Sequence, residues 1–152
     1  MAISRRTVSV QSEVAVDADE AYHFWNDRLA YPQFIPGLES VEIIDAVWSR
    51  WSVLGRSDPI EVETTDNVLH QYVAWRMRDQ HGERVSLWVE PGAAEASALL
   101  RLEISWRPEP DAPPVTAQLQ RAQTTLDRFH TFLANELERQ PAGVRESSMS
   151  EG

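Results

Sequence analysis

The four histidines are the residues best suited to acid–base or metal chemistry in this sequence, and their spacing argues against both roles. They stand at His23, His70, His81 and His130. No pair has the His-x-x-x-His spacing that is typical of metal ligands on a helix. The chain has no cysteine, which excludes thiol catalysis, thiolate metal ligands and disulfides. We therefore predict no metal site and no cofactor.

The other polar side chains form no recognisable catalytic set. There is no Gly-x-Ser-x-Gly motif for a serine nucleophile and no glycine-rich phosphate loop. The carboxylates Glu61, Glu63 and Glu103 fall on the polar side of alternating segments, which indicates solvent-exposed surface. Arg76 follows Trp75 and therefore faces away from the apolar side of its segment. The sequence thus leaves the catalytic residues unknown.

The composition indicates one globular domain without nucleic-acid binding. Its 152 residues are 42% hydrophobic and 25% charged, which is ordinary for a globular protein. The net charge is −10, and the 14 basic residues are all arginines scattered along the chain, whereas nucleic-acid phosphates require clustered cations. Residues 1–6 lack the apolar core of a signal peptide, and no segment is long enough to span a bilayer. These features favour a cytoplasmic location.

Alternation of apolar and polar residues predicts seven β-strands. Residues 7–16 form the first strand, and six more lie between residues 38 and 107. Short turn signals such as His81-Gly82 and Pro91-Gly92 separate them. Consecutive strands joined by short turns indicate an antiparallel sheet with one apolar and one polar face.

Helical signals flank these strands on both sides. Asp17 can cap a helix that runs to about residue 27, and residues 31–37 suit a short helical turn. A long C-terminal helix is expected from about residue 114. Its apolar positions recur every three or four residues, at Val115, Leu119, Ala122, Leu126, Phe129, Leu133 and Leu137. We expect residues 1–139 to form the domain and residues 140–152 a disordered tail.

Four sequence segments resemble the START-like helix-grip superfamily, specifically its polyketide cyclase/dehydrase and coenzyme-Q-binding (SRPBCC) branch. They are residues 14–22, the turn at 31–36 with the strand after it, residues 73–76, and residues 104–108. The resemblance covers roughly residues 8–137. It implies an α+β fold in which a curved seven-stranded antiparallel sheet wraps around the C-terminal helix, with two short helices after the first strand. It also implies a cavity between sheet and helix, with its entrance near the short helices.

The apolar face can be interpreted in two ways. Side chains at strand or helix period usually form a filled core. The resemblance instead favours a cavity lined by aromatic and aliphatic groups, with a few polar groups to orient a ligand. The residues predicted to bind such a ligand are Ser12, Trp51, Thr64, Trp75, Met77, Leu87, Trp106, Leu119, Gln123 and Leu126.

Three functions remain open on this basis. The first is binding or transport of a hydrophobic small molecule such as a lipid, quinone or polyketide. The second is a polyketide cyclase or aromatase, which needs a polar group inside the pocket; the apolar strand face offers no arginine for this role. The third is a protein-interaction module, which predicts a collapsed interior and an exposed apolar patch. The ligand, the pathway and the oligomeric state are left open.

Overall fold

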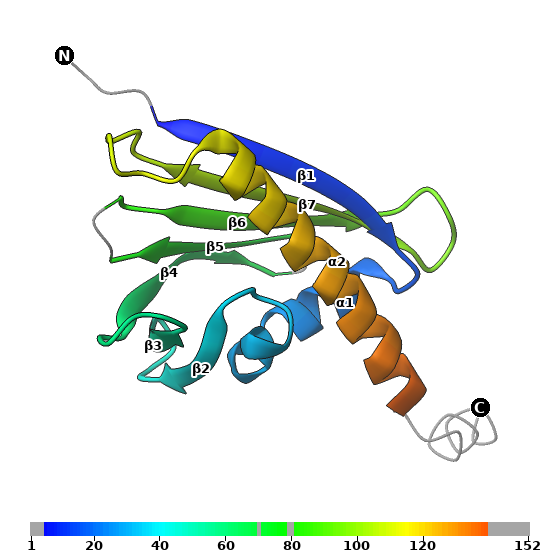
Figure 1. Ribbon diagram of the computed structural model, residues 1–152. Helices are drawn as coiled ribbons and strands as arrows, with labels where there is room; N and C mark the ends of the chain where they lie inside the picture. Colours follow the sequence, from blue (N-terminus) through cyan, green and yellow to red (C-terminus); the bar gives the residue numbers. More distant parts are fainter. Residues whose placement is uncertain (1–4, 70, 79–80, 140–152) are drawn as a thin grey trace.

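The computed structural model describes residues 5–69, 71–78 and 81–139. A seven-stranded antiparallel sheet forms its main layer, in the order β1-β7-β6-β5-β4-β3-β2 (Figure 1). The strands are β1 (Arg6–Val14), β2 (Leu38–Ile43), β3 (Trp48–Val53), β4 (Ile60–Val68), β5 (Tyr72–Met77), β6 (Arg84–Pro91) and β7 (Ala98–Trp106). The helices are α1 (Ala18–Trp25), the 3₁₀ helix η1 (Arg28–Gln33) and α2 (Val115–Arg139). The predicted helix-grip fold is confirmed.

Sequence periodicity accounts for the two faces of the sheet. In β7 every second residue from Ala98 to Trp106 is buried, and the residues between them are half-buried. The pairing between β5 and β6 is continuous from Tyr72 opposite Trp88 to Arg76 opposite Arg84. Register shifts in β2 near Leu38 and in β4 near Thr64 interrupt the ladders. Such irregularities bend a sheet locally.

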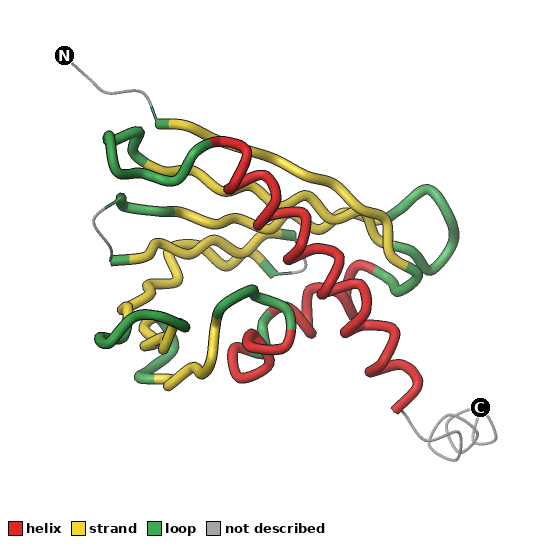
Figure 2. The backbone as a smooth tube through the Cα atoms, viewed as in Figure 1, coloured by secondary structure: helices red, strands yellow, loops and turns green. Residues whose placement is uncertain are grey.

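All three helices lie on one face of the sheet (Figure 2). Asp17 caps α1 as predicted, because its carboxylate accepts a hydrogen bond from the Glu20 amide at 3.0 Å. Helix α2 packs mainly on β1 and β7, at one side of the sheet, while η1 packs on β2 at the other. The middle of this face of the sheet is therefore covered by side chains that reach in from α2 and from η1.

The inward face of α2 differs from the predicted stripe at its first turns. Val115 and Leu119 are exposed, Leu119 by 43%, whereas Gln118 and Thr125 are buried. From Ala122 onward the predicted apolar positions Leu126, Phe129 and Leu133 are buried as expected. The predicted inward orientation of Leu119 is thus wrong, because Gln118 takes the buried position at this turn of the helix.

The predicted domain of residues 1–139 and the expected cytoplasmic location stay predictions. The predicted tail, residues 140–152, and His70 lie outside the described residues. In the part of the chain that is described, no helix combines the length and apolar character needed to cross a bilayer.

Candidate ligand-binding site

Aromatic rings occupy the middle of the space between sheet and helices. Trp25 of α1 lies parallel to Trp75 of β5, with 5.4 Å between ring centroids and 3° between planes. Its other neighbours include Phe34 at 5.3 Å and Phe129 of α2 at 5.0 Å. Tyr31 bridges this group to β3, 5.7 Å from Trp51. Side chains therefore fill the centre, where the resemblance implied a cavity.

An apolar groove of about 260 Å³ remains between η1, strands β2–β5 and the first half of α2. Ile35 and Pro36, in the turn that follows η1, form one of its walls. Its lining residues are Ile35, Pro36, Leu38, Trp51, Val53, Arg56, Ile60, Met77, Glu83 and Arg121. The charged residues among them are Arg56, which is exposed, and the Glu83–Arg121 pair. A mostly apolar cleft with a few convergent polar groups is typical of small-molecule sites.

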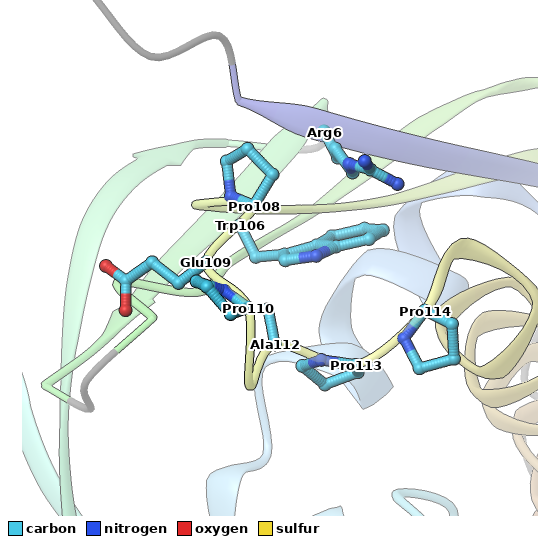
Figure 3. A pocket seen from close by; sticks show the side chains of 8 residues that line it. All are labelled: Arg6, Trp106, Pro108, Glu109, Pro110, Ala112, Pro113 and Pro114. Carbon is cyan, nitrogen blue, oxygen red and sulfur yellow. The ribbon is translucent and has the colours of Figure 1, made fainter.

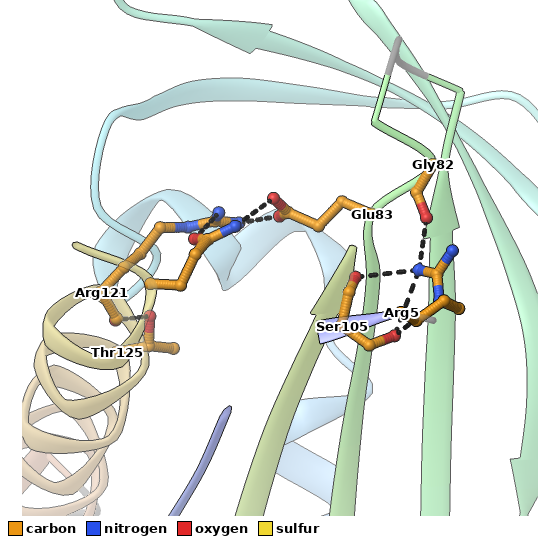
Figure 4. A network of polar contacts seen from close by, with 7 residues as sticks. Arg5, Gly82, Glu83, Ser105, Arg121 and Thr125 are labelled. Atoms are coloured by element: carbon orange, nitrogen blue, oxygen red, sulfur yellow. Dashed lines mark hydrogen bonds and ion pairs between the residues drawn. The ribbon is translucent and has the colours of Figure 1, made fainter. Parts of the chain in front are cut away.

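Glu83 and Arg121 form a buried polar network at the edge of the groove (Figure 4). Glu83 precedes β6, and its carboxylate accepts a charge-assisted hydrogen bond from the guanidinium of Arg121 on α2. Gln118 donates from Nε2 to the second carboxylate oxygen at 3.0 Å and accepts from Arg121 at 3.0 Å. Thr125 donates to the Arg121 carbonyl oxygen at 2.8 Å. The network holds the guanidinium in one orientation.

The electrostatics of this pair favour two permanent charges. Burial alone would raise the pKa of Glu83, but the hydrogen bond and charge of Arg121, with Gln118 and His81, outweigh it and lower the pKa below its ordinary value. Glu83 is therefore ionised at neutral pH and a weak base. Since efficient proton transfer needs a pKa near the working pH, the pair is better suited to binding than to acid–base catalysis.

The predicted site residues do not meet in one place. Trp51 and Met77 line the groove. Trp75, Leu87 and Leu126 are packed in the core. Ser12 is half-buried in β1, opposite Leu100. Gln123 is half-buried on α2 and donates to Asp127 at 2.9 Å.

Thr64 lines a separate polar hollow of about 340 Å³ between α1, η1 and β4–β5. Tyr22 donates to the Asn67 side-chain oxygen there, and Asn67 donates to Asn26 at 3.0 Å. The buried Tyr31 phenol also faces this hollow, and burial raises its pKa above the ordinary value. The side chains of Tyr22, Asn26 and Asn67 thus already bond to one another in this hollow, and Arg28 places a cation at its wall.

Trp106 belongs to a third hollow, of about 340 Å³, beneath the proline-rich link from β7 to α2 (Figure 3). Its indole lies beneath Arg6, with Pro108 and Pro110 around it (Figure 3). The Trp106 side chain is fully buried, so it forms the floor of the hollow rather than a surface for ligand contact.

His81 lies beside carboxylates that are distant in the sequence. Its Nδ1 atom is 3.8 Å from Oε2 of Glu109, and one ligand atom each of His81, Glu109 and Asp111 lie within 4.8 Å of one another. Sequence spacing had predicted no metal ligands. Glu109 already forms an ion pair with Arg107, whose Nε lies 3.2 Å from Oε1. This positive charge weakens the attraction of the three side chains for a metal ion.

Sequence reasoning missed Glu83, Gln118 and Arg121. A signal was present, because Gln118, Arg121 and Thr125 recur at three- and four-residue intervals beside the apolar stripe of α2. The sequence offered no arginine on the apolar strand face, and the arginine that reaches the groove, Arg121, comes from the helix instead.

The curved sheet, the long gripping helix and the groove between them define a helix-grip protein. The chain belongs to the family described as polyketide cyclase/dehydrase and lipid transport, whose model matches residues 14–128. That description supports hydrophobic ligand binding in general.

The individual proteins that the chain is similar to share a quarter or less of its residues. An uncharacterised 17.2 kDa protein from the melC2-rnhH intergenic region of Streptomyces lincolnensis is 24% identical over 127 residues, which cover 80% of this chain and 85% of the relative. A START superfamily protein from Mycobacterium smegmatis is 18% identical with a TM-score of 0.67, covering 89% and 99% of the two chains. Norcoclaurine synthase of Thalictrum flavum, solved with a transition-state analogue, is 14% identical with a TM-score of 0.66, covering 90% and 98%. At these identities the solved structures show the fold alone.

Proposed function

We propose that this protein binds a hydrophobic small molecule, such as a lipid, quinone or polyketide, in the apolar groove. A carbonyl or carboxylate of the ligand would accept hydrogen bonds from Arg121. The observation that carries the proposal is a groove of about 260 Å³ with apolar walls and an oriented guanidinium at its edge. The family description agrees with this class of ligand.

The groove volume limits the ligand. Small-molecule sites usually enclose about 300–1,000 Å³. A groove of about 260 Å³ suits a compact ring system or one end of a longer chain that extends past the Pro36 turn. In the described contacts, Arg121 donates two of its five N–H groups, one to Glu83 and one to Gln118. The others are available to a ligand oxygen.

The test is calorimetric titration with a panel of quinones, fatty acids and aromatic polyketides. We expect saturable binding by the wild type and loss of binding in V53W, whose indole would fill the groove. The matched control is L119W, which adds the same ring to an exposed position on α2. No saturable binding to any panel member, or binding by V53W as tight as that of the wild type, would contradict the proposal.

The contribution of Arg121 can be isolated with matched ligands. In R121Q, affinity for a ligand that carries a carboxylate should fall by about ten- to a hundredfold, because a charge-assisted hydrogen bond contributes about 1.5–3 kcal/mol. Affinity for the matched hydrocarbon should change little. Circular dichroism of R121Q checks that the fold is retained.

A cyclase or aromatase activity is the second candidate, and Arg121 is the observation that favours it. A fixed guanidinium can stabilise negative charge on the oxygen of a carbonyl under attack. The test is conversion of an aromatic polyketone by the wild type and by R121Q. Product profiles identical to those of the uncatalysed reaction would exclude this activity.

The third candidate function, a protein-interaction module, is supported by the packed centre and by exposed apolar side chains. The centre is filled, Ile43, Ile44 and Val47 are exposed at the β2–β3 turn, and Leu29 is exposed on η1. This function predicts self-association or partner capture and no small-molecule binding. The calorimetric panel therefore separates it from ligand binding.

A further inference from the structure

We infer that the outer face of the sheet carries a binding site for a small phosphate-bearing ligand, formed by five arginines at the end where β5, β6 and the N-terminal segment meet. The site is a hollow of about 180 Å³. Its lining residues are Arg5, Arg76, Arg78, Arg84, Arg107, Met77 and Gly82. Among the described residues, no carboxylate lines it. It is independent of the proposed groove function.

The fold gathers arginines that the sequence scatters. Five of the chain's 14 basic residues line this one hollow, although the net charge is −10. Arg76 and Arg78 alternate with the inward-facing Trp75 and Met77, and thus point to the face opposite α2. Pairing of β5 with β6 then sets Arg84 directly opposite Arg76. Like charges directly opposite each other on neighbouring strands destabilise a sheet, and a bound anion would offset that cost.

Only part of this positive charge is compensated by the contacts in the described structure. Glu63 bonds to Arg76 at 2.6 Å and lies 4.0 Å from Arg78, and Glu109 pairs with Arg107. In these described contacts, two carboxylates pair with three of the five guanidinium groups. Within the described part of the chain, the side chain of the exposed Arg84 has neither a hydrogen bond nor an ion pair, so its guanidinium is available to a ligand.

The hollow is organised before any ligand binds. Arg5 donates to the Gly82 carbonyl at 2.7 Å and to the Ser105 carbonyl at 3.0 Å, which holds it across the ends of two strands (Figure 4). Burial lowers the pKa of Arg5, and the charges of Arg84 and Arg107 lower it further. Gly82 has a φ of +55°, and an added Cβ would lie 3.0 Å from Nη1 of Arg107. The bare backbone therefore lets Arg107 approach closely.

Arginine geometry selects the ligand class. Guanidinium groups form paired, charge-assisted hydrogen bonds with phosphate oxygens. A hollow of about 180 Å³ suits a phosphate or pyrophosphate group rather than a folded partner. The group can come from a free phosphorylated molecule or from a phospholipid head group, and the chemistry of recognition is the same.

The experiment titrates the full chain with inorganic phosphate and pyrophosphate at constant ionic strength, and in a second arm with vesicles that contain phosphatidic acid. R84Q removes a guanidinium that has no described bond, so the fold should be retained. The matched control is R101Q, because Arg101 lies on the same face but stacks on Trp88, 5.0 Å from the ring centroid.

We expect saturable binding in at least one arm, about tenfold weaker in R84Q and nearly unchanged in R101Q. The arm that responds identifies the source of the phosphate. Absence of saturable binding in both arms, or equal weakening in R84Q and R101Q, would overturn the inference. Binding of the groove ligand should be the same in R84Q and wild type. The experiment can therefore contradict the phosphate site without contradicting the proposed groove function, and the reverse.

Discussion

Glu83 and Arg121 stand 38 residues apart in the chain, yet they form an ion pair at the edge of the groove. Each looks ordinary in the sequence: one is a charged residue in a turn, the other a charged residue on an amphipathic helix. Only the crossing of α2 over the sheet brings them together. Local patterns predict which face a residue occupies, but not which distant residue it meets, so the spacing on α2 could point to Arg121 but not to its contact with Glu83.

Removing the Glu83 charge should destabilise the protein in a pH-dependent way. E83Q is expected to lower the free energy of unfolding by about 2 kcal/mol near pH 7, because the half-buried Arg121 loses a charged acceptor. The pKa of Glu83 is lowered from 4.5 in the folded state. Its stabilisation is therefore complete above that value and is lost as the pH falls through the lowered pKa. Urea unfolding of both proteins across this range measures the difference.

The control for this prediction is E61Q. Glu61 is exposed and lies 3.9 Å from Arg50, so the change should stay below about 0.5 kcal/mol at every pH. A difference between E83Q and wild type that stayed constant as the pH fell would show that the ion pair contributes nothing to folding.

At the scale of elements, the pattern of apolar residues predicted the strands well because period-two alternation reports directly on a half-buried sheet. The long helix α2 was predicted at the right place in the chain, but the buried face of its first turns was assigned to the wrong residues. Gln118 and Thr125 are buried although polar, since Gln118 bonds to Glu83 and Thr125 to the helix backbone. Hydropathy alone assigns such residues to solvent, and it therefore placed Leu119 inward.

Two leucines on α2 test this corrected orientation. L126A should lower the free energy of unfolding by about 2–5 kcal/mol, because it leaves a cavity in the core. L119A removes the same atoms from an exposed position and should change stability by less than about 0.5 kcal/mol. Thermal and chemical unfolding of the two variants measure the contrast. Equal losses would mean that Leu119 packs inward after all.

At the scale of the whole molecule, the aromatic cluster determines where a ligand can bind. The resemblance implied a cavity between sheet and helix, but large aromatic rings from α1, η1, α2 and the strands meet at its centre. Whether such rings fill a space depends on their mutual orientation rather than on composition. Sequence patterns identify which rings face inward. They do not fix whether the rings line a void or fill it, because both arrangements bury the same residues.

Ligand binding to the groove should stabilise the whole fold. A ligand that binds only the folded state adds about 2.7 kcal/mol at one hundred times its dissociation constant. We expect the melting temperature of the wild type to rise with ligand concentration and that of V53W to stay constant. Scanning fluorimetry with the tightest member of the panel checks this. A rise in V53W equal to that of the wild type would place the ligand elsewhere.

The sheet remains open, so β1 and β2 each present an unpaired backbone edge. Helix α2 packs on β1, whereas β2 has only six residues, a register shift and two exposed glutamates, Glu39 and Glu42. Short, irregular and charged edges resist addition of a strand from another molecule. The acidic residues of β2 therefore protect this protein from fibrous aggregation, a danger inherent in any sheet whose ends do not join.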